Sequence, residues 1–235
     1  MNAFDMIVNF FKQGGAFLYP IAAVFAVGLG FAVERFIYLH RVAKGNRRLW
    51  AELAPLIKAG NFRKAMELAE QTDSALSTVM RYGMSRIATA QRREDIEKAM
   101  EESLIEVIPH LEKRTHYLAT LANVGMLMGL LGTVIGLINA FAAVAAVNPA
   151  EKAAMLSASI SVAMNNTALG LGLAITLLLC HMYLETKTTE LVDSLEVASI
   201  KFLNSISERR QAVAEPASAA VSARVTEKIL GAARA

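Results

Sequence analysis

The hydrophobic positions of this chain gather into three long runs without charge. Residues 13–33, 115–150 and 153–184 contain no Asp, Glu, Lys or Arg. A helix needs about 20 apolar residues to cross the hydrocarbon layer of a bilayer, and each run reaches that length. The pattern therefore predicts an all-α, polytopic membrane protein. Its three transmembrane helices are expected at residues 16–39, 115–147 and 154–186.

The second and third predicted helices are longer than a bilayer requires, so we expect both to extend into the cytoplasm. Only a short periplasmic turn, residues 148–153, separates them. A connection of this length joins antiparallel neighbours. These two helices are therefore expected to pack side by side as a hairpin.

The remaining segments are predicted to be helical or interfacial. Apolar residues recur at helical spacing through residues 40–114, for example at Leu49 and Leu53, which indicates a region of cytoplasmic helices. Residues 1–15 carry apolar side chains on one face, which is typical of an amphipathic segment in the membrane interface. Residues 187–235 are expected to form a cytoplasmic helix with an Ala-rich tail, to which no function is assigned.

The distribution of Lys and Arg sets the predicted orientation. Residues 40–114 contain fourteen of them, whereas the segment before the first helix has Lys12 and the turn has Lys152. Cytoplasmic loops carry the basic excess. We therefore expect a protein of the bacterial inner membrane, with its N-terminus in the periplasm and its C-terminus in the cytoplasm. The net charge of +3 is too small to indicate nucleic acid as a partner.

Four glycines of the second predicted helix lie at intervals of 4, 3 and 4 residues. These intervals place them on one helix face, where small residues let two backbones approach closely. We interpret the face as a helix-packing seam, which is functional only if its partner helix moves. Its members are Gly125, Gly129, Gly132 and Gly136.

A polar step interrupts the hairpin at one depth. Thr133 and Thr167 lie 15 and 14 residues from the two ends of the predicted turn, which at 1.5 Å per residue puts both roughly 21–22 Å from it. Asn165 and Asn166 lie at the same level. Each buried amide needs hydrogen-bond partners within the hydrocarbon layer. We favour an ion or water pathway through these four residues, and interhelical hydrogen bonding remains the alternative.

The membrane runs contain no side chain that could carry a proton at this depth. If the hairpin lines a proton or sodium path, the titrating carboxylate must come from another protein. The only nearby candidates, His181 and Glu185, are expected at the cytoplasmic end of the third helix, and scattered histidines of this kind more often lie at the interface. The chain lacks a phosphate-binding loop and metal-ligand spacing, and it has one cysteine. We therefore expect no enzyme, no metal site and no cofactor.

The string MGLLGTVIGLINAF at residues 128–141 resembles the second transmembrane helix of the ExbB/TolQ/MotA proton-channel superfamily. The segment Thr-Ala-Leu-Gly-Leu at residues 167–171 and the Glu34-Arg35 step at the end of the first helix also fit. The resemblance covers most of residues 16–205. It implies a homopentamer around a dimer of a single-span ExbD- or TolR-like partner, whose membrane Asp carries the proton. The family's two pore threonines fall on Thr133 and Thr167.

The sequence departs from ExbB and TolQ at positions that matter. Val162 stands where those proteins have a Glu five residues before the threonine, and Asn165-Asn166 replaces small or apolar residues. The resemblance thus implies a divergent ExbB/TolQ-like stator, a molecular motor subunit driven by the ion motive force of protons or of sodium. The alternatives are a MotA-like stator for flagellar or gliding motility and a membrane scaffold that conducts nothing.

Overall fold

The computed structural model describes residues 15–87, 89, 90, 92–145 and 148–232, with side chains described as far as residue 211 except residue 210. Over these residues the chain forms helices and no strand, which confirms the all-α prediction. The predicted amphipathic segment 1–15 lies outside the described residues apart from Gly15. The helices are α2 (Leu18–Ala59), α3 (Phe62–Glu70), α4 (Ala75–Arg86), α5 (Arg93–Glu112), α6 (Thr115–Ala145) and α7 (Pro149–Ala232).

Three helical stretches are long and apolar enough to cross a membrane, by length and composition. They are Leu18–Ala59, Arg93–Ala145 and Pro149–Arg209. Each overlaps most of one of the three predicted transmembrane helices, and the chain is a membrane protein.

The chain divides into two units, each with its own internal contacts. The first, here called the membrane unit, comprises residues 1–40 and 112–189. The second, here called the polar unit, comprises residues 41–111 and 190–235. The long helices α2 and α7 contribute to both.

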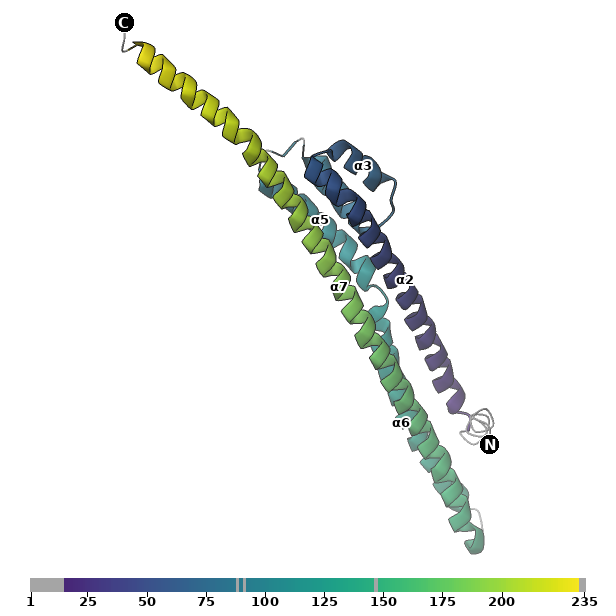
Figure 1. Cartoon of the computed structure of the whole chain (residues 1–235). Coiled ribbons are helices and arrows are strands. Elements are labelled where there is room, and N and C mark those ends of the chain that lie inside the picture. Colours follow the sequence, from purple (N-terminus) through teal and green to yellow (C-terminus); the bar gives the residue numbers. More distant parts are fainter. Residues whose placement is uncertain (1–14, 88, 91, 146–147, 233–235) are drawn as a thin grey trace. The chain divides into compact units, whose positions relative to one another are not determined.

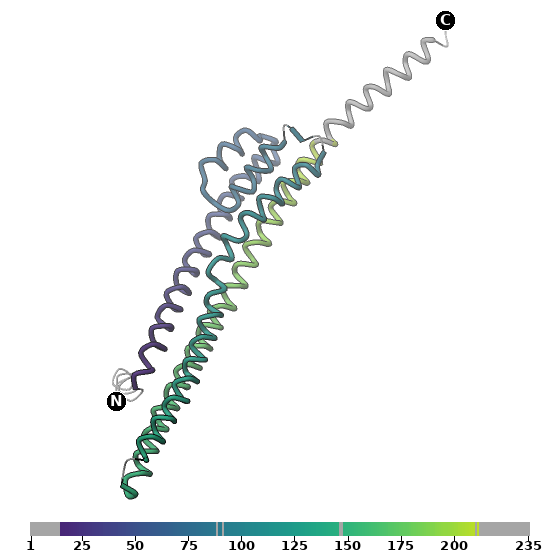
Figure 2. Tube along the Cα trace, turned by 180° about the vertical axis from the view of Figure 1, so that it is seen from behind, coloured from purple at the N-terminus to yellow at the C-terminus, as the bar shows by residue number. Residues whose placement is uncertain are grey.

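Within the membrane unit, α6 and the first half of α7 run antiparallel and side by side, as both views show (Figures 1 and 2). The predicted turn over residues 148–153 is wrong in length, because α7 begins at Pro149. Proline suits the first position of a helix, where a backbone N–H has no partner to lose. The amide of Glu151 donates to the carbonyl of Asn148 (3.0 Å), and this bond starts the first turn.

The first long helix runs beyond the predicted boundary at residue 39. No proline follows that position before Pro55, and α2 continues through Pro55 to Ala59. Gly60 ends it with φ +72°, the left-handed conformation that glycine adopts without steric cost. The boundary predicted at residue 186 likewise falls inside the continuous helix α7.

The polar unit has a core of large apolar side chains. Phe202 is fully buried, meets Phe62 edge to face with ring centroids 6.4 Å apart, and lies beside Gly83. Other side chains buried to at least 98% include Leu53, Leu76, Met80, Ile96 and Met100. At the surface of this unit, the negative charge of Glu106 and a hydrogen bond from the Tyr82 hydroxyl to it (3.2 Å) raise the pKa of Tyr82.

Candidate ion-pathway site

The hydroxyls of Thr133 on α6 and Thr167 on α7 hydrogen-bond to each other. Each also lies within hydrogen-bond distance of the Gly129 carbonyl, at 3.1 Å and 3.2 Å respectively. The predicted equal depth of the two threonines is therefore confirmed. Their part in an ion pathway stays a prediction.

Two hydroxyl hydrogens must serve three contacts in this cluster. A threonine hydroxyl donates one hydrogen bond, so one hydroxyl donates to the Gly129 carbonyl while the other donates to the first hydroxyl. Exchanging the roles of Thr133 and Thr167 gives a second arrangement with the same contacts. The cluster thus has two hydrogen-bond patterns and always keeps a hydroxyl lone pair for an outside donor or cation.

The glycine face of α6 packs on α7. A Cβ added to Gly129 would lie 2.9 Å from the Asn166 backbone oxygen and 3.0 Å from the Gly170 Cα. Added carbons at Gly125, Gly132 and Gly136 would meet Leu173, Asn166 and Ala163. Successive glycines along α6 therefore meet residues of decreasing number along the antiparallel helix α7. This register brings Thr133 and Thr167 together.

The two asparagines differ in their surroundings. Asn166 is 3% exposed and its side chain lies against Gly132, whereas Asn165 is half-buried. The side-chain oxygen of Asn166 is buried and has no hydrogen-bond partner among the described residues. Asn166 therefore lies in the seam between α6 and α7. The role of both residues in a pathway stays a prediction.

The end of the first apolar run carries an ion pair between distant parts of the sequence. Glu34 on α2 accepts from the Arg114 guanidinium at 2.9 Å. Arg114 lies between α5 and α6 with φ +70°. Its neighbour in this cluster, Arg35, is 3% exposed and stacks over Tyr38, 4.8 Å from the ring centroid.

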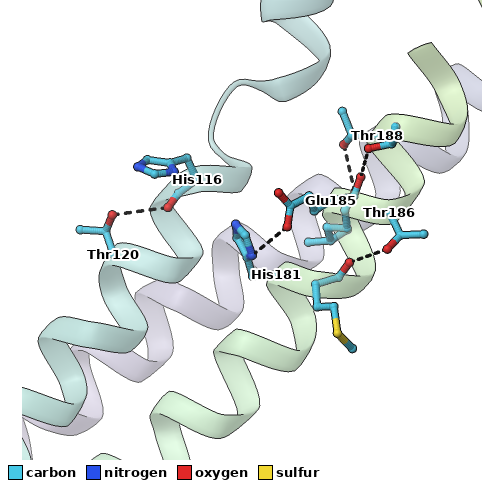
Figure 3. A network of polar contacts seen from close by, with 9 residues as sticks. His116, Thr120, His181, Glu185, Thr186 and Thr188 are labelled. Atoms are coloured by element: carbon cyan, nitrogen blue, oxygen red, sulfur yellow. Dashed lines mark hydrogen bonds and ion pairs between the residues drawn. The ribbon is translucent and has the colours of Figure 1, made fainter. Parts of the chain in front are cut away.

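A second titratable pair lies on α7 (Figure 3). The Nδ1 of His181 is 3.5 Å from the Glu185 carboxylate. The sequence placed both residues near the helix end but assigned them no function. One signal for the pair is their spacing of four residues, which brings two side chains together on one helix face. Among the described residues, no cluster of three His, Cys, Asp or Glu side chains could hold a metal ion.

Comparison with known proteins gives two matches. The model of the MotA/TolQ/ExbB proton channel family matches residues 71–197, more than half of the chain. A protein of Methanothermobacter thermautotrophicus, described as a biopolymer transport protein ExbB homolog, is 28% identical over 198 residues. That alignment covers 84% of this chain and 69% of the other protein. Both threonines and the glycine seam lie within residues 71–197.

Proposed function

The chain belongs to the MotA/TolQ/ExbB proton channel family, and from this premise we propose that it is the ion-conducting stator subunit of an ExbB/TolQ-like membrane motor. The motor uses the proton or sodium motive force and transfers energy to the cell envelope. The subunit conducts without a cofactor and catalyses no covalent reaction. It lies in the inner membrane with its N-terminus in the periplasm and its C-terminus in the cytoplasm, in accordance with the distribution of Lys and Arg.

The proposal includes a partner because the apolar runs lack a carboxylate at the depth of the threonines. Residues 115–150 and 153–184 contain no carboxylate, so a proton crossing at this depth must be held by another chain. A homopentamer around a single-span, ExbD- or TolR-like subunit with a membrane Asp would supply that group. The hydroxyls of this chain would then line the path along which the Asp exchanges its ion.

The observation that carries the proposal is the cluster of Thr133, Thr167 and the Gly129 carbonyl. Its two hydrogen-bond patterns use the same three oxygen atoms and have the same number of hydrogen bonds. Interchange between them moves only hydroxyl hydrogens. In either pattern the cluster can accept a hydrogen bond from a carboxylic acid, and a hydroxyl that gives up its bond within the cluster can donate to a carboxylate, without moving a helix. Hydroxyl and carbonyl oxygens also suit sodium, which leaves both ions within the proposal.

The test is ion flux through the chain and its partner, reconstituted together in liposomes. Thr167→Val removes the hydroxyl and keeps the side-chain volume, and we expect flux to fall about a hundredfold if the hydroxyl takes part in proton transfer. Thr176→Val is the matched control, because Thr176 lies on the same helix and bonds only to its own helix, at the Gly172 carbonyl (2.8 Å). Native mass measurement checks that both variants assemble.

Several outcomes separate the alternatives. Unchanged flux and force output in Thr167→Val and in Asn166→Leu would show that the cluster only packs helices. A wild-type complex that assembles with its partner but passes neither protons nor sodium would indicate a scaffold. Varying sodium at fixed pH identifies the ion, and restoration of envelope transport against restoration of motility distinguishes an ExbB/TolQ-like from a MotA-like stator.

A further inference from the structure

His181 and Glu185 lie on the same face of α7 as Thr167. Glu185 follows Thr167 by 18 residues, which is five full turns at 3.6 residues per turn and about 27 Å of helix. His181 follows by 14 residues and is within about 40° of that face. Between the threonine and the pair, this face carries apolar residues such as Leu171 and Leu178. After Glu151, Glu185 is the first carboxylate of α7, and His181 is its first imidazole.

The exposure of the two side chains rises in the direction away from Thr167. The His181 side chain is 19% exposed and that of Glu185 is 67% exposed. The imidazole is thus largely covered, while the carboxylate is open to the surroundings. A proton that reaches the imidazole can therefore pass to a more exposed group.

The neighbouring helices of the membrane unit bring further charges to this level. Phe36 of α2 stacks on Tyr183 of α7 and on His40, with ring centroids 6.1 Å and 6.3 Å apart. The charged or titratable side chains near this level are Glu34, Arg35, Tyr38 and His40 on α2, Arg114, His116 and Tyr117 around the start of α6, and Lys187 on α7 itself.

Of the two carboxylates at this level, Glu34 and Glu185, only Glu185 lies beside the His181 imidazole. The Glu34 carboxylate is engaged with Arg114 at 2.9 Å. Figure 3 shows Glu185 pointing toward the imidazole, with His116 on the neighbouring helix. The Glu185 carboxylate is therefore the negative group that stabilises a transient imidazolium at His181.

We propose that His181 and Glu185 form a proton-accepting site at which protons leave the pathway on the cytoplasmic side, so that the coupling ion is the proton. The inference rests on the proposed function and deepens it. A proton adds to Nε2 of the neutral imidazole, and the Nδ1 proton then transfers to the Glu185 carboxylate. The carboxylic acid releases that proton to water, and the imidazole returns to its starting tautomer by exchange with water, in which Nδ1 gains one proton and Nε2 loses one. No bond other than N–H and O–H forms or breaks.

The test is proton flux in liposomes that contain the complete complex of this chain with its partner. The internal pH is varied between 5 and 8, the range in which imidazoles change charge, at constant driving force. We expect His181→Gln and Glu185→Gln each to lower flux about tenfold or more, within the contribution of a positioned proton-transfer group, and to flatten the dependence on internal pH. Glu185→Asp, which keeps the carboxylate, should retain most of the flux.

Matched controls are His110→Gln, an exposed histidine of α5, and Glu151→Gln, an exposed carboxylate at the far end of α7. Both should keep the wild-type rate and pH profile. The inference is overturned if His181→Gln and Glu185→Gln conduct like wild type while Thr167→Val does not, or if a sodium gradient alone drives the complex. A wild-type complex that conducts no ion overturns the proposed function as well, so the two failures are distinguishable.

Discussion

Most of the exposed large apolar side chains belong to the membrane unit, whereas the polar unit buries most of its own. In the polar unit, Phe202 and Leu53 have 0% exposure. In the membrane unit, α6 exposes Leu127 and Phe141 at 59% and 64%, and its glycines pack on α7 instead. One chain therefore contains a core of the kind found in water and a seam of the kind found in lipid.

The difference follows from the solvent of each unit. Burying apolar surface is favourable in water, so the polar unit gathers its large side chains inside. Lipid tails are as apolar as leucine, and helices in a bilayer associate through close backbone contact between small residues. The close approach of Gly129 to Gly170 is such a contact. The same substitution should consequently have different effects in the two units.

The largest expected effect is from truncating a phenylalanine in the polar unit. Phe202→Ala removes a fully buried ring and should destabilise this unit by about 3–5 kcal/mol. Phe141→Ala, the same change at a 64% exposed position of α6, should alter stability by less than about 0.5 kcal/mol. Thermal unfolding of both variants in detergent measures the difference. Equal losses at the two positions would contradict the contrast between the units.

The next effect tests the seam with a residue made larger. Gly129→Val places a side chain against the Asn166 backbone oxygen and the Gly170 Cα, at 2.9 Å and 3.0 Å from the first added carbon. Overpacking of this kind costs about 1–3 kcal/mol. Gly172→Val is the control on the facing helix, where an added Cβ meets nothing within 4 Å. A Gly129 variant as stable as the Gly172 variant would show that the helices do not approach closely here.

The helices and the pairing of Thr133 with Thr167 were predictable because the geometry of a helix is regular. Uncharged runs mark the spans, and a constant rise per residue converts sequence distance into depth. The predicted turn was too long, yet the threonines still meet. The register is set by the glycine seam, whose spacing is visible in the sequence, so an error in the turn does not displace the pair.

Other features depend on contacts that local patterns do not encode. Glu34 and Arg114 are 80 residues apart, and nothing in the sequence near either residue identifies its partner. The facing of Asn166 into the seam depends on which side of α7 meets α6. The left-handed conformation of Arg114 could not be predicted from the sequence, because glycine or asparagine is the usual residue at such a helix end.

The smallest effect concerns that helix end, where the membrane unit has a half-exposed ion pair that salt can screen. The Glu34–Arg114 pair is about half exposed, and exposed ion pairs contribute about 0.2–1 kcal/mol. Arg114→Ala should therefore cost up to that amount in low salt and nothing in about 1 M salt, where charges are screened within a few ångströms. Thermal unfolding in detergent at the two salt concentrations measures it.

Arg114→Gly separates the ion pair from the backbone. It also loses the pair, but it relieves a left-handed conformation that costs a residue with a Cβ about 1–2 kcal/mol. We expect the glycine variant to be more stable than the alanine variant by about that cost, offset by up to about 1 kcal/mol because glycine gains more freedom on unfolding. If alanine is the more stable of the two at both salt concentrations, the chain does not adopt a left-handed turn between α5 and α6. If the glycine variant is the more stable, α6 begins beside a strained residue that an ion pair holds in place. Further along the same helix, close packing of glycines on α7 takes that part.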